Sequence, residues 1–214
     1  MSTRGDATQG YPHRSRSGPG GKKISPACGQ ALTQRMAPAA RGDSGFAHGA
    51  LSRLTLHSRT AHVRCVDVAL LDLRRATLEE ILPLRHAVLR PGQPMEAACF
   101  DADGDATTRH FGAFVLASGE NVCCVSCMRA PREGADAWQV RGMATRGDLV
   151  RRGIGHALLS FAVAALRAED GPRLLWCNAR TTALDFWQHE GWTVASDVFD
   201  IPGVGPHRVM QRIL

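Results

Sequence analysis

The segment Arg151-Arg152-Gly153-Ile154-Gly155-His156 has the residue types of a phosphate-binding loop. We place it between a strand predicted over 137–145 and a helix that runs to about residue 167. Glycines let main-chain N–H groups converge on one point, and a helix start adds free donors and positive potential. The segment therefore predicts a pyrophosphate site, with the two arginines at its rim. A strand-to-helix turn that binds nothing has the same glycine spacing, so this alternative stays open.

Two common nucleotide-binding motifs are excluded at this loop. A Walker loop needs Gly-Lys-Ser/Thr, which is missing. A dinucleotide-binding fingerprint needs a carboxylate about 20 residues further on within a βαβ unit. Glu169 and Asp170 lie near that distance, but the elements that follow do not continue such a unit.

The apolar pattern from Val68 onward predicts a mixed α/β domain of the α+β type. Thr77 and Glu80 have capping-box spacing, which predicts a helix start, and Pro91-Gly92 predicts its end. The helix after the phosphate loop is apolar nearly all round, so we expect it to pack deeply against a sheet. The expected order is β-α-β-β-β-α-β-α-β-β, with strands over 68–73, 110–117, 122–128, 137–145, 173–177, 192–199 and 207–214.

Composition excludes several classes of protein. The chain has 214 residues, of which 44% are hydrophobic and 21% charged, as in ordinary soluble globular proteins. Its apolar runs, of which Phe161 to Leu166 is typical, fall far short of the roughly 20 residues of a membrane helix. No secretory signal is evident. Seven cysteines without a regular spacing favour a reduced, cytoplasmic protein.

The positive charge is concentrated in residues 1–66. This segment has ten Lys/Arg and two Asp, a net charge of +8, whereas residues 67–214 have sixteen Arg and eighteen Asp/Glu, a net charge of −2. With nine Gly, four Pro and no apolar period, residues 1–66 are predicted to be a disordered basic tail. An organelle transit peptide, a nucleic-acid-binding arm and a misassigned start codon are the alternatives. Residues 67–214 form the predicted domain.

The predicted domain resembles the GCN5-related N-acetyltransferase (GNAT) superfamily across residues 68–214. The pieces that carry the resemblance are Gln139-Val140-Arg141-Gly142-Met143-Ala144-Thr145, Arg152-Gly153-Ile154-Gly155, Asn178, Ala183-Leu184-Asp185-Phe186-Trp187 and Gly191-Trp192. A narrower similarity is to poorly characterised bacterial acyltransferases of the ElaA/YjcF type. It rests on Leu89-Arg90-Pro91-Gly92-Gln93, Asp101, Asp103, His110 and Gly205-Pro206-His207.

The resemblance implies a site for acetyl-CoA. The pantetheine arm would lie in a gap between the fourth and fifth strands and pair with the main chain of Met143, Ala144 and Thr145 like an added strand. The pyrophosphate would bind amides from Arg151, Arg152, Gly153, Ile154, Gly155 and His156. Asn178 and Phe186 would contact the pantetheine arm. A main-chain N–H near Met143 would polarise the acetyl carbonyl, and an amine would attack the thioester directly.

Two departures from the family pattern concern proton transfer. Trp187 stands where many members have a tyrosine that protonates the departing thiolate, and an indole N–H is too weak an acid for this. The chain's single tyrosine is Tyr11, outside the predicted domain. The strand-four glutamate that often serves as general base is also missing. His110 and His207 are the candidate bases, because the pKa of histidine suits this role. Scaffold histidines and a water chain are the alternatives.

Three residues are candidates for acceptor binding. Asp101 and Asp103 would bind an ammonium group, unless they form a solvated turn, and Arg141 would pair with a carboxylate of the acceptor. We predict no metal site. Cys124 and Cys127 have zinc-knuckle spacing, but residues three apart in a strand face opposite ways, so buried structural thiols are expected.

The sequence thus predicts an acetyl-CoA-dependent N-acyltransferase that acts on a primary amine of a small molecule or amino-bearing metabolite. The alternatives are another acyl-CoA donor, a protein N-terminus or lysine as acceptor, a non-catalytic acyl-CoA-binding module, and a factor tethered to nucleic acid by the tail. We expect no membrane association. Dimers are frequent among similar proteins, so a homodimer is compatible with this prediction.

Overall fold

The computed structural model describes residues 67–214, so the predicted basic tail over 1–66 lies outside the described residues. These residues form one eight-stranded sheet with the order β1-β2-β3-β4-β5-β8-β6, in which β7 also pairs with β8. The strands are β1 (Leu71–Ala76), β2 (Arg109–Val115), β3 (Asn121–Arg129), β4 (Ala137–Thr145), β5 (Leu174–Arg180), β6 (Thr193–Val194), β7 (Phe199–Ile201) and β8 (Gly205–Ile213).

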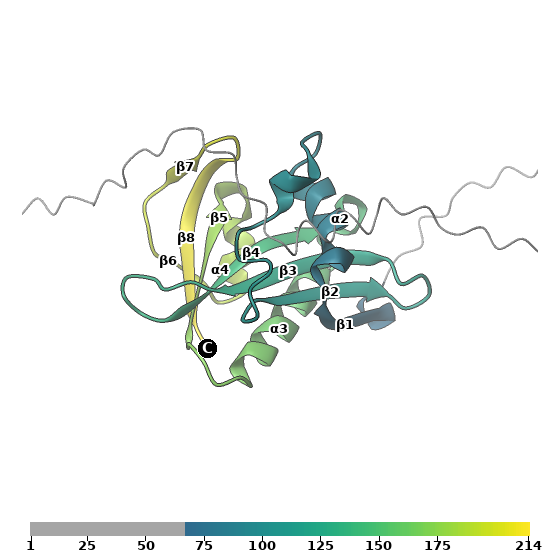
Figure 1. Ribbon diagram of the computed structural model, residues 1–214, viewed down its shortest axis with the longest axis horizontal. Coiled ribbons are helices and arrows are strands. Elements are labelled where there is room, and N and C mark those ends of the chain that lie inside the picture. The colour runs from purple at the N-terminus through teal and green to yellow at the C-terminus, as the bar shows by residue number, and fades with distance from the viewer. Residues whose placement is uncertain (1–66) are drawn as a thin grey trace, which may run out of the picture.

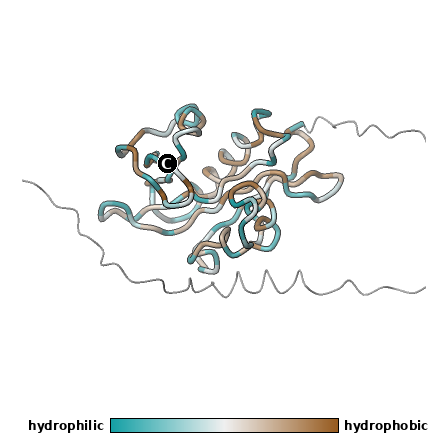
Figure 2. The backbone as a smooth tube through the Cα atoms, turned by 90° about the horizontal axis from the view of Figure 1, so that it is seen from above, coloured by the Kyte–Doolittle hydropathy of each residue, from teal (hydrophilic) through white to brown (hydrophobic). Residues whose placement is uncertain are grey.

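Two helices cover the two faces of the sheet. Helix α2 (Leu78–Leu89) contacts β2, β3 and β4, and helix α3 (Ile154–Arg167) lies on the other face against β1–β4 (Figures 1 and 2). A third, short helix, α4 (Leu184–His189), follows β5. The short 3-10 helices are η1 (Val68–Leu70), η2 (Met95–Ala98), η3 (Gly147–Leu149) and η4 (Thr181–Ala183). None of the helices between residues 67 and 214 combines the length and apolarity needed to cross a membrane.

The capping box predicted for the first helix is confirmed. The Thr77 hydroxyl accepts from the Glu80 N–H at 3.4 Å, and the Glu80 carboxylate accepts from the Thr77 N–H at 2.8 Å. These two bonds satisfy orphan donors at the helix start. The helix ends at Leu89, just before Pro91, as predicted.

The strands β4 and β5 pair only briefly. They are parallel, and their register covers Ala137 to Gln139 against Leu174 to Trp176. Beyond these pairs β5 and β8 turn away from the direction of β1–β4 (Figure 1). Residues 140–145 of β4 therefore have backbone groups on this side that no strand of the described sheet pairs with, which makes them an edge open to an added strand.

A bulge interrupts β4 beside this gap. Ala144 faces Cys124 of β3 while Arg141 faces Ser126, so β4 has one residue more than β3 between these pairs. Gly142 has a φ of +61°, and a Cβ there would lie 2.8 Å from a ring carbon of Phe100. Both the backbone conformation and the close approach require glycine. A bulge redirects nearby backbone groups, here those around Met143.

The structure differs most from the predicted elements at three strands. Residues 68–70 form η1 because the Asp67 carboxylate accepts from the Ala69 N–H, so β1 starts at Leu71. Strand β5 extends three residues beyond the predicted end at 177. The strand predicted over 192–199 is split into β6 and β7. Between them the Ser196 hydroxyl accepts from the Val209 N–H at 2.8 Å and replaces a ladder bond.

The cysteines of β3 face both sides of the sheet, as the alternation predicted. Cys123 and Cys127 belong to the core cluster against α3, whereas Cys124 packs with Ile81 of α2. These three and Cys177 are free, buried thiols, while Cys99 is disulfide-bonded.

Candidate active site

The larger of two cavities lies between the end of β4, the start of α3, and α4. It has a volume of about 1040 Å³. Met143, Ala144 and Thr145 line it from β4, Phe186 and Trp187 line it from α4, and Gly153 and Gly155 line it from the start of α3. A cavity of this size is at the upper end of those that hold cofactor-sized ligands.

The start of α3 leaves its first N–H groups without side-chain partners. Gly153 is the N-cap with a φ of +76°, and no side chain caps the helix. The first turn contains no acidic residue, and Arg151 two positions earlier also has a positive φ of 61°. A left-handed turn that leads into an uncapped helix start exposes several converging donors. The geometry matches an anion site at the mouth of the larger cavity.

The smaller cavity, of about 230 Å³, lies on the other side of Met143, towards β7 and β8. Gln139, Arg141 and Gly142 line it from β4, and His207 lines it from β8. Met143, Ala183 and Trp187 line both cavities. The two cavities therefore adjoin at these three residues.

Comparison with known proteins identifies the family. No protein-family model matches this chain. The chain is similar to YitI, described as an uncharacterized N-acetyltransferase of Bacillus subtilis strain 168. The two are 32% identical over 146 residues, which are 68% of this chain and 97% of YitI. The chain belongs to the GNAT superfamily of N-acetyltransferases.

Solved structures of acetyltransferases share the fold. Escherichia coli ElaA is 18% identical, has a TM-score of 0.51, and aligns over 66% of this chain and 99% of its own. An aminoglycoside 6'-N-acetyltransferase complexed with coenzyme A is 12% identical, has a TM-score of 0.50, and aligns over 66% of this chain and 96% of its own. These similarities confirm the predicted GNAT fold.

Most residues predicted to bind coenzyme gather in this N-acetyltransferase at the larger cavity. Eight of them line it: Met143, Ala144, Thr145, Arg151, Gly153, Gly155, His156 and Phe186. The Ile154 side chain is instead buried in the core, so only its backbone N–H, at the uncapped start of α3, is available to a ligand. Arg152 does not line the cavity, and Asn178 lines the smaller one. His156 is bonded to Glu190 at 2.8 Å.

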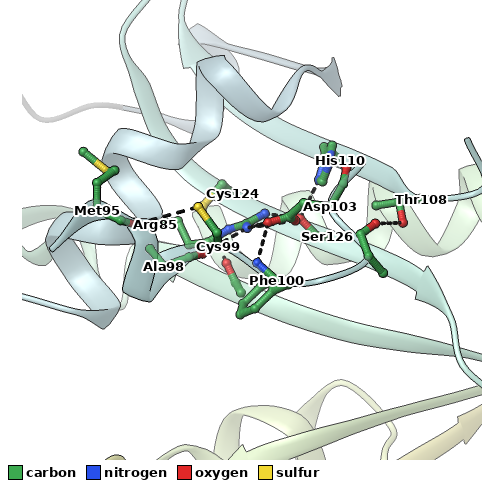
Figure 3. A network of polar contacts seen from close by, with 12 residues as sticks. Arg85, Met95, Ala98, Cys99, Phe100, Asp103, Thr108, His110, Cys124 and Ser126 are labelled. Carbon is green, nitrogen blue, oxygen red and sulfur yellow. Dashed lines mark hydrogen bonds and ion pairs between the residues drawn. The ribbon is translucent and has the colours of Figure 1, made fainter. Parts of the chain in front are cut away.

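His110 does not reach either cavity of this N-acetyltransferase. Its Nε2–H donates to the Asp103 carbonyl at 3.1 Å, so Nδ1 of the neutral ring accepts from the Ser126 hydroxyl at 2.7 Å (Figure 3). The Ser126 oxygen in turn accepts from Arg85 at 2.6 Å. Both ring nitrogens are thus used within the scaffold. Among the alternatives weighed for His110, this favours the scaffold role, and we do not retain it as a candidate base.

His110 should make the protein less stable as the pH is lowered. Burial lowers the pKa of His110 and the Arg85 charge lowers it further, against the opposing effects of Asp103 and Glu79. Below about pH 6.5 the unfolded chain then binds a proton that the folded one excludes. We expect the free energy of unfolding to decrease as pH falls from about 6.5, by at most about 1.4 kcal/mol per unit from this group.

Urea unfolding at a series of pH values between 5 and 8 tests this expectation. The variant His110→Gln should show a flatter dependence than the natural chain across that window. Ion pairs lower the pKa of three carboxyl groups, Glu80, Asp148 and Glu169, so these groups titrate below this range and do not obscure it. Equal slopes for the two proteins would contradict the assignment of a neutral His110.

His207 has the surroundings of a proton acceptor. It is buried at the edge of the smaller cavity, and its Nδ1–H donates to the Gly205 carbonyl at 2.7 Å. This bond fixes the tautomer in which Nε2 carries the lone pair. Among the described residues Nε2 has no hydrogen-bond partner. Of the two predicted histidines, only His207 therefore has a free acceptor nitrogen at a cavity.

Of the three residues predicted to bind the acceptor, only Arg141 lines a cavity. Arg141 lines the smaller cavity, whereas Asp101 is exposed and lines neither cavity. Asp103 is fully buried and forms an ion pair with Arg85 at 2.8 Å, so its carboxylate is used within the scaffold (Figure 3). A solvated turn, the alternative for these two aspartates, describes Asp101 and not Asp103.

Sequence reasoning did not select two arginines that line the smaller cavity, Arg90 and Arg180. Arg180 lies two residues after Asn178 in β5, so strand alternation places both on one face, which is a signal that the sequence contained. Arg90 follows the first helix, and its place in the cavity depends on how α2 packs on the sheet. No local pattern reports that packing.

Two further side chains at the cavities bear on the chemistry. Trp187 is buried and packs edge-on against Trp192 at 4.8 Å, as expected of a packing residue. Cys177 lines the smaller cavity, but burial strongly raises the pKa of its thiol. The thiol therefore stays protonated, which disfavours it as a nucleophile.

Proposed function

We propose that this N-acetyltransferase transfers an acetyl group from acetyl-CoA directly to a primary amine of a small molecule. The observation that carries the proposal is the meeting of two cavities at Met143, Ala183 and Trp187. The larger cavity suits the coenzyme and the smaller one suits an acceptor. The coenzyme A complex of the aminoglycoside acetyltransferase with this fold supports the choice of donor.

The residues present fit acetyl-CoA. The uncapped start of α3 offers donors to its pyrophosphate, and the open edge of β4 offers backbone groups to its amide-containing arm. Acetyl-CoA supplies an activated thioester carbonyl. In the proposed mechanism the β4 backbone at the bulge, near Met143, donates to the carbonyl oxygen as negative charge develops there.

In this proposal His207 accepts the proton of the attacking amine at Nε2, while the Gly205 carbonyl holds its ring. Proximity in the two adjoining cavities supplies the rest of the rate enhancement. We assign no general acid, because no tyrosine lies within residues 67–214 and Trp187 is too weakly acidic. A thiolate can leave without one, since thiol pKa values lie near 8.5.

The small volume beside His207 supports a small acceptor rather than a lysine of a folded protein. We place the reaction in the cytoplasm, where acetyl-CoA is available. The proposal requires neither a metal nor a nucleic-acid partner.

Thiol release from acetyl-CoA over a panel of amines tests the function. Turnover on any amine, with the matching amide detected by mass spectrometry, supports a transferase. Coenzyme binding with no turnover would instead indicate a non-catalytic acyl-CoA-binding module, one of the alternatives from the sequence.

The variant Gly155→Leu tests the location of the coenzyme. A Cβ at Gly155 would lie 3.4 Å from the Met143 methyl and 3.6 Å from a ring carbon of Phe186, so a longer side chain fills the larger cavity. We expect the dissociation constant for acetyl-CoA to rise by about 10- to 100-fold, the effect of overpacking by roughly 1–3 kcal/mol. Calorimetry measures it.

Gly147→Leu is the matched control, because Gly147 is exposed and nothing lies within 4 Å of its Cβ position. The affinity of Gly147→Leu for acetyl-CoA should stay within about twofold of that of the natural chain. Unchanged affinity in Gly155→Leu as well would place the coenzyme elsewhere.

A further inference from the structure

The smaller cavity carries an unbalanced positive charge. Its lining contains three arginines, Arg90, Arg141 and Arg180, together with His207, and contains no aspartate or glutamate. Charged groups that converge on a cavity without partners normally have a ligand of opposite sign. Burial lowers the pKa of Arg90, and the nearby positive charge of Arg180 lowers it further. Arg90 and Arg180 are therefore close to each other.

None of these three guanidinium groups forms an ion pair with a carboxylate in the part of the chain described, from 67 to 214. Seven other arginines in the same part do: Arg74, Arg75, Arg85, Arg109, Arg129, Arg132 and Arg146. Ion pairing is therefore common among the sixteen arginines of this part of the chain, and none of the three at the smaller cavity has it. The carboxylates that act on Arg141 are Asp103, which is bonded to Arg85, and Asp101, which is exposed.

Arg141 is held in place without a carboxylate. Its guanidinium lies 4.1 Å from the centre of the Phe100 ring, and Arg85 lies 4.6 Å from the same ring. Stacking on an aromatic ring orients a guanidinium group and leaves the N–H donors in the guanidinium plane available to a ligand. These donors can bind a planar carboxylate or a phosphate with two parallel hydrogen bonds.

Arg180 and His207 are direct partners across β5 and β8. Cross-strand partners share a face of the sheet, with Cβ atoms about 4.5–5.5 Å apart. An anion on Arg180 therefore lies near the proposed proton acceptor. This juxtaposition suits a compact acceptor whose amine and acidic group are a few bonds apart.

We infer that the acceptor is an acidic amine, such as an amino acid, whose carboxylate or phosphate group binds the arginine cluster of Arg90, Arg141 and Arg180. This inference rests on the proposed function and names its substrate class. The same positive charge disfavours an ammonium group in the cavity, so the acceptor amine is favoured there in its neutral, nucleophilic form. Polycationic amines are disfavoured for the same reason.

The test compares matched amines on the full-length protein with acetyl-CoA. The carboxylate arms are L-alanine against L-alaninamide and L-glutamate against L-glutamine, the phosphate arm is O-phospho-L-serine against L-serine, and spermidine is the cationic arm. Binding is followed by calorimetry in the presence of CoA, and turnover by thiol release. We expect at least one acidic amine to bind, and to be acetylated, about 10- to 100-fold better than its uncharged counterpart. Spermidine should show no turnover.

Variants link this preference to the cluster. Arg180→Gln, at an exposed position that should not disturb folding, and Arg141→Gln should each reduce the preference by about tenfold or more. Their affinity for acetyl-CoA should change by less than about threefold. Arg173→Gln is the control, because Arg173 is exposed and lines neither cavity.

The outcomes separate the two proposals. If acetyl-CoA binds and neutral or cationic amines are used as well as acidic ones, the inference fails and the transferase function stands. A preference that persists in both arginine variants also overturns it. If acidic members bind preferentially through the cluster but nothing is acetylated, the anion site is supported and the proposed function falls.

Discussion

Replacing His207 with glutamine should lower kcat for acetyl transfer by about 10²- to 10⁴-fold, the usual contribution of a general base. The ring is held by the Gly205 carbonyl with Nε2 left as acceptor, and a glutamine amide offers no comparable base. The affinity for acetyl-CoA should change little, because His207 lines only the smaller cavity. Steady-state kinetics and calorimetry together separate these effects.

His86 provides the control for this variant. One of its ring nitrogens also bonds a backbone carbonyl, that of Gln93 at 2.6 Å, but it lines neither cavity. His86→Gln should therefore keep kcat within about threefold. A kcat for His207→Gln close to that of the natural enzyme would exclude His207 as the base.

The variant Asp103→Asn should destabilise the fold by about 3–5 kcal/mol, the typical cost of leaving one charge of a buried pair without its partner. Both side chains of the Arg85–Asp103 pair are fully buried. Asp103 also accepts from the Phe100 N–H at 2.7 Å, and Arg85 packs against the position where Gly142 has no side chain. Loss of the carboxylate therefore disturbs the loop before β2 and the β4 bulge together.

Urea unfolding measures this cost, and Asp136→Asn is its matched control. Asp136 pairs with Arg129 at 2.9 Å, but its side chain is 66% exposed, so its loss should cost less than about 1 kcal/mol. If the two variants were equally stable, the buried pair would not be a main support of this face of the sheet.

The elements that local signals define were predictable. The capping box at Thr77 and Glu80 fixed the start of α2, and the glycines at 153 and 155 marked the start of α3 with its free donors. These signals depend on residues within one turn of each other. The loop between β4 and α3 therefore predicted a pyrophosphate site, whereas the gap beside β4 was implied only by the resemblance to the GNAT superfamily.

The features that depend on distant residues were not predictable. The β4 bulge depends on the register with β3 and on Phe100 and Arg85 meeting Gly142. His110 and His207 are the same residue type near a strand start, and only their tertiary partners distinguish them. Asp103 was expected at an acceptor because nothing local shows that Arg85, 18 residues earlier, neutralises it in the interior.

The central claim is that backbone donors at the start of α3 bind the pyrophosphate of a coenzyme whose arm lies along β4. Calorimetry of the full-length protein with CoA and with pantetheine, which lacks the pyrophosphate and nucleotide, tests it most directly. Each hydrogen bond from a backbone N–H to the charged pyrophosphate contributes about 1.5–3 kcal/mol. Several such bonds predict that CoA binds at least about 100-fold more tightly than pantetheine. No measurable binding of CoA, or equal affinities for the two ligands, would contradict the account.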